Sequence, residues 1–152
     1  MSALPEGYEL TDDQTRIDVK AAHAFLARSY WSPGVALELV ERSLANSLCV
    51  AVYHDGEQVA FARVVSDRAT FAWLADVHVL EEHRGKGISK AMVAALLAHP
   101  ELQGLRRWML STLDAHELYR GFGWDTPAYP ERLMERMAAS DHAPPVASAP
   151  QS

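Results

Sequence analysis

Apolar residues follow two different periods along the chain. Between Leu48 and Leu80 they form three runs of strand length, separated by short polar breaks. The first break contains Asp55 and Gly56, a pair that is the strongest short-range signal for a β-hairpin. In other stretches apolar residues recur every three or four positions, as they do along one face of a helix. The pattern therefore predicts a mixture of strands and helices.

The boundaries of these elements follow from the runs and their breaks. Ser32 and Pro33 resemble an N-cap and a first helical residue, and Asp114 is expected to cap a later helix. The expected helices are Asp18–Ser29, Val35–Leu44, Gly87–His99 and Asp114–Arg120. The expected strands are Tyr8–Thr11, Leu48–Tyr53, Gln58–Val65, Thr70–Leu80, Arg106–Thr112 and Arg132–Met137.

The order of the elements predicts how the sheet is built. Three successive strands joined by short turns form an antiparallel meander. The helix Gly87–His99 then crosses between Thr70–Leu80 and Arg106–Thr112, and such a crossover joins parallel strands. We therefore expect an α/β fold, with a mixed, mostly antiparallel central sheet and flanking helices.

Length and composition set the domain organisation. The chain has 152 residues, enough for one ordinary domain, which we place at residues 1–137. Residues 138–152 are rich in Ala, Pro and Ser, with too little apolar bulk to offset the entropy of ordering. This tail is expected to be disordered.

Charge and residue usage exclude several classes of function. The net charge is −6, which argues against general nucleic-acid binding. No apolar run approaches the ~20 residues of a membrane-spanning helix, and the N-terminus lacks the pattern of a signal peptide. Cys49 is the one cysteine, so no internal disulfide forms, and we expect it to be an inert core residue. The seven histidines show no metal-ligand spacing. We expect a cytoplasmic protein without a metal or a membrane partner.

One basic stretch stands out in this acidic chain. Arg84, Lys86 and Lys90 lie within residues 83–90, which contain no acidic residue. The stretch follows the strand that ends at Leu80 and runs into the helix that begins near Gly87. Backbone N–H groups at a helix N-terminus have no partners within the helix, and the helix dipole is positive there. The stretch therefore predicts an anion site.

The glycines of this stretch fit the same interpretation. Gly85 and Gly87 lack a β-carbon, so a phosphate can approach the backbone closely. The spacing matches neither the nucleotide-triphosphate loop nor the dinucleotide fingerprint. The alternative is that both glycines only turn the chain, with the basic side chains solvated.

Two segments resemble motifs of the GNAT family of N-acetyltransferases. Val77–Lys90 resembles its acyl-CoA signature, Gln/Arg-x-x-Gly-x-Gly/Ala, with Arg84, Gly87 and Ser89 in the defining places, although Ser89 replaces the usual glycine or alanine. Leu118–Trp124 resembles its Leu-Tyr-x-x-x-Gly-Phe segment, with Trp in place of Phe. The resemblance covers roughly residues 48–124.

The resemblance implies an acyl-CoA N-acyltransferase-like fold. Two central strands would splay apart and hold the pantetheine arm of acetyl-CoA between them. The backbone of two strand residues would pair with that arm, and amides of the basic stretch would bind the pyrophosphate. The residues so implied in cofactor binding are Val77, Val79, Arg84, Gly85, Lys86, Gly87, Ile88, Ser89, Lys90 and Thr112.

Acetyl transfer to an amine needs a proton donor for the thiolate and a proton acceptor for the amine. The second motif implies Tyr119 as the general acid; alternatively Tyr119 only packs beside Phe122. Asp76 and His78 share one strand face and are candidate bases, acting through water. Alternatively, Asp76 caps a turn or pairs with an arginine, and His78 is a half-buried structural residue.

The resemblance also suggests where the acceptor binds. Tyr30 and Trp31 lie at the joint of the first two helices, where relatives build the acceptor pocket; core packing is the alternative. We expect an N-acetyltransferase that uses acetyl-CoA to acetylate a primary amine of a small molecule or peptide by direct attack in a ternary complex. The alternative is a non-catalytic acyl-CoA sensor or regulatory module, which would not need Tyr119. A homodimer is compatible with the resemblance, because dimers are common among relatives.

Overall fold

The computed structural model describes residues 4–138. The tail predicted to be disordered therefore lies outside the described residues, apart from Ala138. Two compact units follow one another along the chain, one ending at Ser111 and the other beginning at Thr112. The single domain expected at residues 1–137 stays a prediction.

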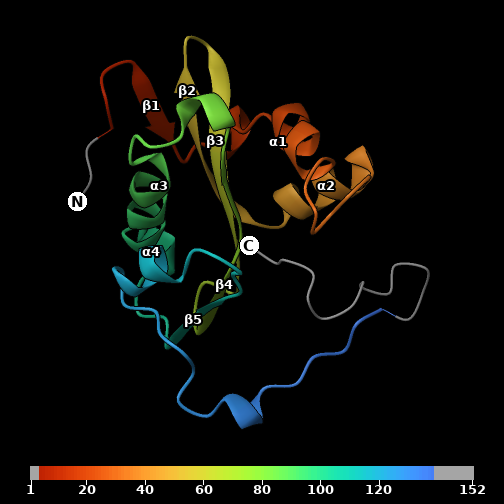
Figure 1. Ribbon diagram of the computed structural model, residues 1–152, viewed down its shortest axis with the longest axis vertical. Helices are drawn as coiled ribbons and strands as arrows, with labels where there is room; N and C mark the ends of the chain where they lie inside the picture. Colours follow the sequence, from red (N-terminus) through yellow and green to blue (C-terminus); the bar gives the residue numbers. More distant parts are fainter. Residues whose placement is uncertain (1–3, 139–152) are drawn as a thin grey trace. The chain divides into compact units, whose positions relative to one another are not determined.

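A five-stranded sheet organises the first unit, in the order β1-β2-β3-β4-β5 (Figure 1). Its strands are β1 (Tyr8–Thr11), β2 (Leu48–His54), β3 (Glu57–Ser66), β4 (Phe71–Val79) and β5 (Arg107–Leu110). Neighbouring strands from β1 to β4 are antiparallel, and β4 pairs with β5 in parallel. The predicted meander and the predicted crossover are both confirmed, and with them the fold class.

The turn between β2 and β3 shows why the hairpin forms there. Asp55 has φ of 51° and Gly56 has φ of 81°. Positive φ at both central residues is the signature of a type I′ turn, whose twist matches that of the flanking strands. The turn brings His54 opposite Glu57 and so fixes where the β2–β3 ladder begins.

Two helices precede the meander. Helix α1 (Val19–Leu26) lies within the predicted range Asp18–Ser29 and begins after Asp18, whose side chain accepts a hydrogen bond from the Ala21 amide at 3.0 Å. Helix α2 (Leu37–Ala45) begins later than predicted, after Ala36. The start at Ser32-Pro33 is wrong because Gly34 has φ of 69°, a left-handed conformation that a right-handed helix does not pass through.

Helices cover both faces of the sheet (Figure 1). On one side α1 and α2 pack on β2 and β3 through a cluster of buried residues: Ala22, Leu26, Val40, Leu44, Cys49, Ala51 and Phe61. On the other side α3 (Ile88–Leu97) contacts β2, β3 and β4 and buries Ile88, Met92 and Leu96, three residues of the predicted helix Gly87–His99. This layering leaves the end of β4 and the start of α3 at one end of the sheet.

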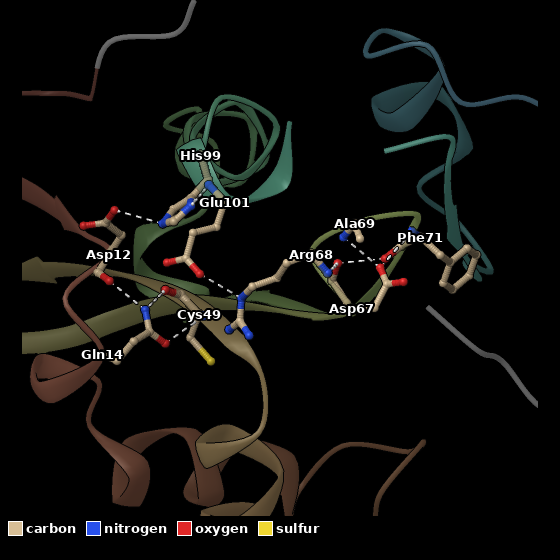
Figure 2. Close-up of polar contacts among 10 residues, drawn as sticks. Asp12, Gln14, Cys49, Asp67, Arg68, Ala69, Phe71, His99 and Glu101 are labelled. Atoms are coloured by element: carbon tan, nitrogen blue, oxygen red, sulfur yellow. Dashed lines mark hydrogen bonds and ion pairs between the residues drawn. The ribbon is translucent and has the colours of Figure 1, made fainter. Parts of the chain in front are cut away.

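Polar side-chain contacts connect the segment after β1 to β2 and to His99, which follows α3 (Figure 2). The Gln14 side-chain amide donates to the Cys49 carbonyl at 2.9 Å and accepts from the Cys49 amide at 3.0 Å. The His99 ring meets Asp12 at 3.2 Å. Gln14 thus pairs with β2 as an additional strand residue would, which keeps the backbone groups of Cys49 satisfied.

The second unit contains α4 (His116–Arg120) and the 3₁₀ helix η4 (Pro130–Arg132). Asp114 does not cap α4: Ala115 is the N-cap, and the Thr112 hydroxyl accepts from the Ala115 amide at 3.0 Å. The predicted strand Arg132–Met137 is also wrong. Its residues are exposed and have no strand partner among the described residues, and without a partner a strand cannot satisfy its backbone groups.

Across residues 4–138, no helix combines the length and the apolar character that crossing a membrane requires.

Candidate functional site

The turn between β4 and α3, residues 80–90, presents unpaired amides; we call it the β4–α3 turn. It leaves the sheet at Leu80, whose amide donates to the Val59 carbonyl at 2.9 Å. It then forms the 3₁₀ helix η2 (Glu81–His83). The N-cap of α3 is Gly87, without a side-chain cap, and the first helical bond comes from the Ala91 amide, at 3.0 Å. The preceding amides of α3 therefore have no helical acceptor and suit an anion.

The two glycines leave the front of this turn open. Gly85 has φ of 77° and Gly87 has φ of 78°, conformations that glycine adopts without strain. A Cβ atom built on either residue would meet no other atom within 4 Å. The Lys86 and Lys90 side chains are exposed beside this opening. The residues present therefore fit a diphosphate.

Arg84 is anchored at its stem. Its Nε donates to the Val79 carbonyl at 3.0 Å, while the residue as a whole is exposed. A guanidinium carries five N–H donors, so this bond orients the group and leaves its terminal amino groups for an anion.

The β4–β5 ladder stops halfway along β4. Its last pair is Leu74 with Leu110, and residues 75–79 continue without a strand partner on that side among the described residues. The two strands thus part where the resemblance expects the pantetheine arm.

The pairing of β4 with β3 determines the direction of the backbone N–H and C=O groups in residues 75–79, the part of β4 that does not pair with β5. The Leu80–Val59 bond marks a hydrogen-bonded pair, and such pairs alternate with non-hydrogen-bonded ones in an antiparallel ladder. Val79 lies opposite Ala60, and Val77 lies opposite Ala62, both in non-hydrogen-bonded positions. Their N–H and C=O groups therefore point away from β3, toward the side where β5 has ended. Arg84 already occupies the Val79 carbonyl, so the Val79 N–H is the group that remains.

Asp76 is held in a buried polar network. Arg63 Nε donates to its Oδ2 at 2.7 Å, and Trp31 Nε1 donates to its Oδ1 at 3.3 Å. Arg63 also donates to the Ser47 hydroxyl at 3.1 Å. Only 7% of Asp76 is exposed. The arginine partner was an open alternative in the sequence. Its identity could have been inferred, because Arg63 is a lone cation in an apolar strand.

His78 lies deeper than expected. It is 7% exposed, and its ring stacks on Phe25 with 3.5 Å between centroids and an interplanar angle of 5°. Its Nδ1 is buried without a hydrogen-bond partner among the described residues. Burial lowers the pKa of His78 to about 3, and the positive charges of Arg84 and Arg28 add to this effect. His78 is therefore neutral at physiological pH.

The predicted acceptor residues lie next to this strand face. Trp31 contacts Phe25, with 5.6 Å between ring centroids, and reaches Asp76 through its indole N–H. Tyr30 meets Trp31 edge-on at 5.2 Å and is 45% exposed. The joint between α1 and α2 is thus tied to β4 by Trp31, while Tyr30 faces solvent. The role of Phe25 has no signal in the sequence beyond its place on the apolar side of α1.

The second unit carries Thr112 and Tyr119. Tyr119 is buried, and its ring lies edge-on against Trp124 at 5.7 Å. Burial, and to a lesser extent the charge of Asp114, raises the pKa of Tyr119 to about 12. The phenol therefore keeps its proton at neutral pH. The Thr112 hydroxyl is used within the turn that leads into α4.

The potential metal ligands and Cys49 are the remaining candidates for chemistry. Across the described part of the chain, no group of three or more His, Cys, Asp and Glu side chains is placed to hold a metal ion. Cys49 is buried, and burial raises the pKa of its thiol to about 12, as expected for an inert core cysteine.

Comparison with known proteins identifies the family. The model of the "Acetyltransferase (GNAT) family" matches residues 8–124. The crystal structure of a GNAT-family protein from Xanthomonas campestris pv. campestris superposes with a TM-score of 0.86 at 45% identity, covering 93% of this chain and 100% of that one. A protein of Gibberella zeae that carries an acetyltransferase name is 29% identical over 135 residues, which cover 74% of this chain and 75% of the relative.

A more distant structure shares the fold alone. It is a GNAT family acetyltransferase from Elizabethkingia anophelis with acetyl-CoA bound, 10% identical with a TM-score of 0.62, covering 88% of this chain and 90% of that one. The match to the family model spans most of the sequence, and the Xanthomonas structure agrees with it over nearly its whole length. The chain therefore belongs to the GNAT acetyltransferase family.

Proposed function

We propose that the protein is an acetyl-CoA-dependent N-acetyltransferase that acetylates a primary amine of a small molecule or peptide. The single observation that carries the proposal is the β4–α3 turn. It combines unpaired helix amides, two open glycines and three basic side chains at the end of the half-free strand β4. When bound, acetyl-CoA supplies an acetyl group activated as a thioester.

In this proposal, different residues of the chain bind different parts of acetyl-CoA. The amides of Gly87 to Lys90 bind the pyrophosphate, and Arg84, Lys86 and Lys90 add charge. The Val77 backbone pairs with the pantetheine arm, and the Val79 N–H donates to the acetyl carbonyl oxygen. These roles are supported by the outward direction of both residues' backbone groups.

Two proton transfers complete the reaction. Tyr119 donates a proton to the departing sulfur, which is supported by a phenol that stays protonated at neutral pH. Asp76 and His78 are the proposed acceptors of the amine proton, through water. Asp76 is held in a fixed orientation by Arg63 and Trp31, and His78 is neutral at physiological pH because burial lowers its pKa to about 3.

The acceptor amine binds beside Trp31 and Tyr30 and attacks directly, within a ternary complex. A cationic acceptor is favoured during encounter, since the chain has 20 acidic and 14 basic side chains. A cytoplasmic homodimer, without nucleic acid or a membrane as partner, stays part of the same prediction.

The proposal is tested by calorimetric titration with coenzyme A, followed by a panel of amines assayed for thiol release from acetyl-CoA. Arg84→Glu is expected to abolish measurable binding, and Arg106→Glu, an exposed arginine outside the turn, should leave it intact. Absence of heat with the wild-type protein, or equal binding by both variants, would overturn the proposal.

The same experiment separates the enzyme from a sensor. An acyl-CoA-binding regulatory module would give heat with coenzyme A and no thiol release with any amine. The enzyme gives both.

A further inference from the structure

A hydrogen bond joins the β4–α3 turn to the far edge of the sheet. Tyr8, the first residue of β1, lies with its hydroxyl 2.7 Å from His83 Nδ1. The two rings meet edge-on, with 5.6 Å between centroids. His83 closes η2 and directly precedes Arg84. In the sheet order β1 is three strands from β4, so the turn is fastened to a strand that its own strand does not touch.

A third ring supports this contact. His54, the last residue of β2, stacks on Tyr8 with 4.3 Å between centroids and lies 5.2 Å from His83. The Tyr8 ring is thus held from one side by its neighbouring strand while its hydroxyl reaches the turn. Such packing fixes the direction of the hydroxyl before any ligand binds.

The turn therefore has two anchors, at the adjacent residues His83 and Arg84. Arg84 Nε is bonded to Val79 at the end of β4, and His83 is bonded to Tyr8 on β1. Between these anchors and α3 the chain contains Gly85 and Gly87, both with open space where a β-carbon would lie. Glycine loses more conformational freedom on ordering than any other residue. A turn of this composition gains affinity from any contact that orders it in advance.

We propose that Tyr8 and His83 are positioning residues for the anion-binding turn, and that their hydrogen bond sets the affinity for the cofactor without taking part in acetyl transfer. This inference rests on the proposed function. The hydrogen bond between the Tyr8 hydroxyl and His83 Nδ1 holds the backbone of residues 84–87 in the conformation that binds the pyrophosphate. Neither side chain contacts the reacting atoms.

The primary test is Tyr8→Phe, which removes the hydroxyl and keeps the ring. A lost hydrogen bond of this kind is expected to raise the Kd for coenzyme A and the KM for acetyl-CoA by about three- to ten-fold. The kcat and the KM for the amine should not change, because the acceptor side of the site is untouched. Calorimetry and two-substrate steady-state kinetics measure both parts of this split.

Tyr53→Phe is the matched control. Tyr53 also lies near the β1 edge of the sheet, and its hydroxyl donates to the Arg16 carbonyl, away from the turn. It should leave the KM for acetyl-CoA unchanged. Equal effects of Tyr8→Phe and Tyr53→Phe on that KM would overturn the inference.

His83 provides a second, independent readout. Asn places a polar atom where His carries Nδ1, so His83→Asn should retain most of the affinity. His83→Leu should reproduce the loss seen with Tyr8→Phe, and combining the two should add little, because both remove the same bond. Equal affinity of the Asn and Leu variants, or a fall in kcat as the main effect, would contradict a positioning role.

Failure of this inference can be told apart from failure of the proposed function. If the wild-type protein binds coenzyme A and the Tyr8 and His83 variants bind equally well, only the positioning role is lost. If the wild-type protein gives no heat with coenzyme A, both are overturned.

Discussion

Arg63 and Asp76 lie opposite each other on β3 and β4 and form an ion pair, with 2.7 Å between Nε and Oδ2, in which Asp76 is buried and Arg63 is half-buried. Asp76 also accepts from Trp31, so the pair links the sheet to the joint between α1 and α2. A carboxylate held in this way is an acceptor with fixed orientation. It serves the structure and the proposed proton transfer through the same contacts.

The ion pair predicts a stability pattern. Arg63→Met should lower the free energy of unfolding by about 3 kcal/mol, because it leaves the Asp76 charge buried and unpaired. The double variant Arg63→Met/Asp76→Leu should recover much of that loss, since neither charge remains. Urea unfolding measures both, with Arg42→Met on the exposed side of α2 as control. A single variant no less stable than the control would contradict the buried-pair interpretation.

Tyr119→Phe tests the proposed proton donor. Loss of a general acid should lower kcat on the order of 100-fold, with the affinity for coenzyme A unchanged. Tyr129→Phe, at an exposed tyrosine of the same unit, should keep full activity. Turnover by the Tyr119 variant equal to that of the Tyr129 variant would remove Tyr119 from the reaction and leave the binding site as it is.

The backbone of the β4–α3 turn can be tested through Gly87. Gly87→Ala places a β-carbon at φ of 78°, which should cost about 1 kcal/mol of stability and shift the amides that bind the pyrophosphate. Affinity for coenzyme A should fall about ten-fold, a difference of about 1.4 kcal/mol. Gly104→Ala, at φ of 74° just before β5, should cost similar stability and leave the affinity intact. Thermal unfolding measures the stability and calorimetry the affinity. Equal affinities of the Gly87→Ala and Gly104→Ala variants for coenzyme A would contradict a role of the β4–α3 turn in binding.

His78 predicts a pH dependence of stability. Its pKa is about 3 in the folded state and about 6.5 when unfolded, so between these values the unfolded chain binds more protons. Stability therefore falls as pH is lowered from about 6.5 toward 3, by at most about 1.4 kcal/mol per pH unit from this group, and does not change through it above 6.5. Urea unfolding across pH should show a shallower slope for His78→Gln than for the wild type or for His116→Gln at an exposed histidine. Identical slopes would mean that His78 is protonated in the folded protein.

Most of the fold could be predicted from short stretches of the sequence. The strands of the meander, the Asp55-Gly56 turn and the crossover through α3 are confirmed, because each depends on residues close together in the chain. Three predictions were wrong, and one of them is the cap of α4, where Ala115 is the N-cap in place of Asp114. Helix α2 begins late because Gly34 takes a left-handed conformation, and the strand expected at Arg132–Met137 lacks the partner that pairing requires.

Some residues of the candidate site could likewise be predicted from a short segment, whereas the contacts of others could not. Arg84, Gly85 and Gly87 could be selected from one short segment, since the chemistry of the turn is contained in it. The partners of His78 and His83 could not, because Phe25 and Tyr8 come from other elements. The neutral state of His78 at physiological pH also follows from burial, and burial is a property of the packed chain.

The early end of the β4–β5 ladder also defines a route to inhibition. A linear chain of amides laid along residues 75–79 would meet donors and acceptors already arranged for a strand. The N–H groups of Val77 and Val79 repeat about every 6.6 Å, twice the rise of one strand residue. Because Arg84 occupies the Val79 carbonyl, a ligand gains most by presenting acceptors at that spacing and an anionic group toward Gly87. A short peptide-like scaffold with these two features is expected to compete with acetyl-CoA for the proposed site, without contacting Tyr30 or Trp31.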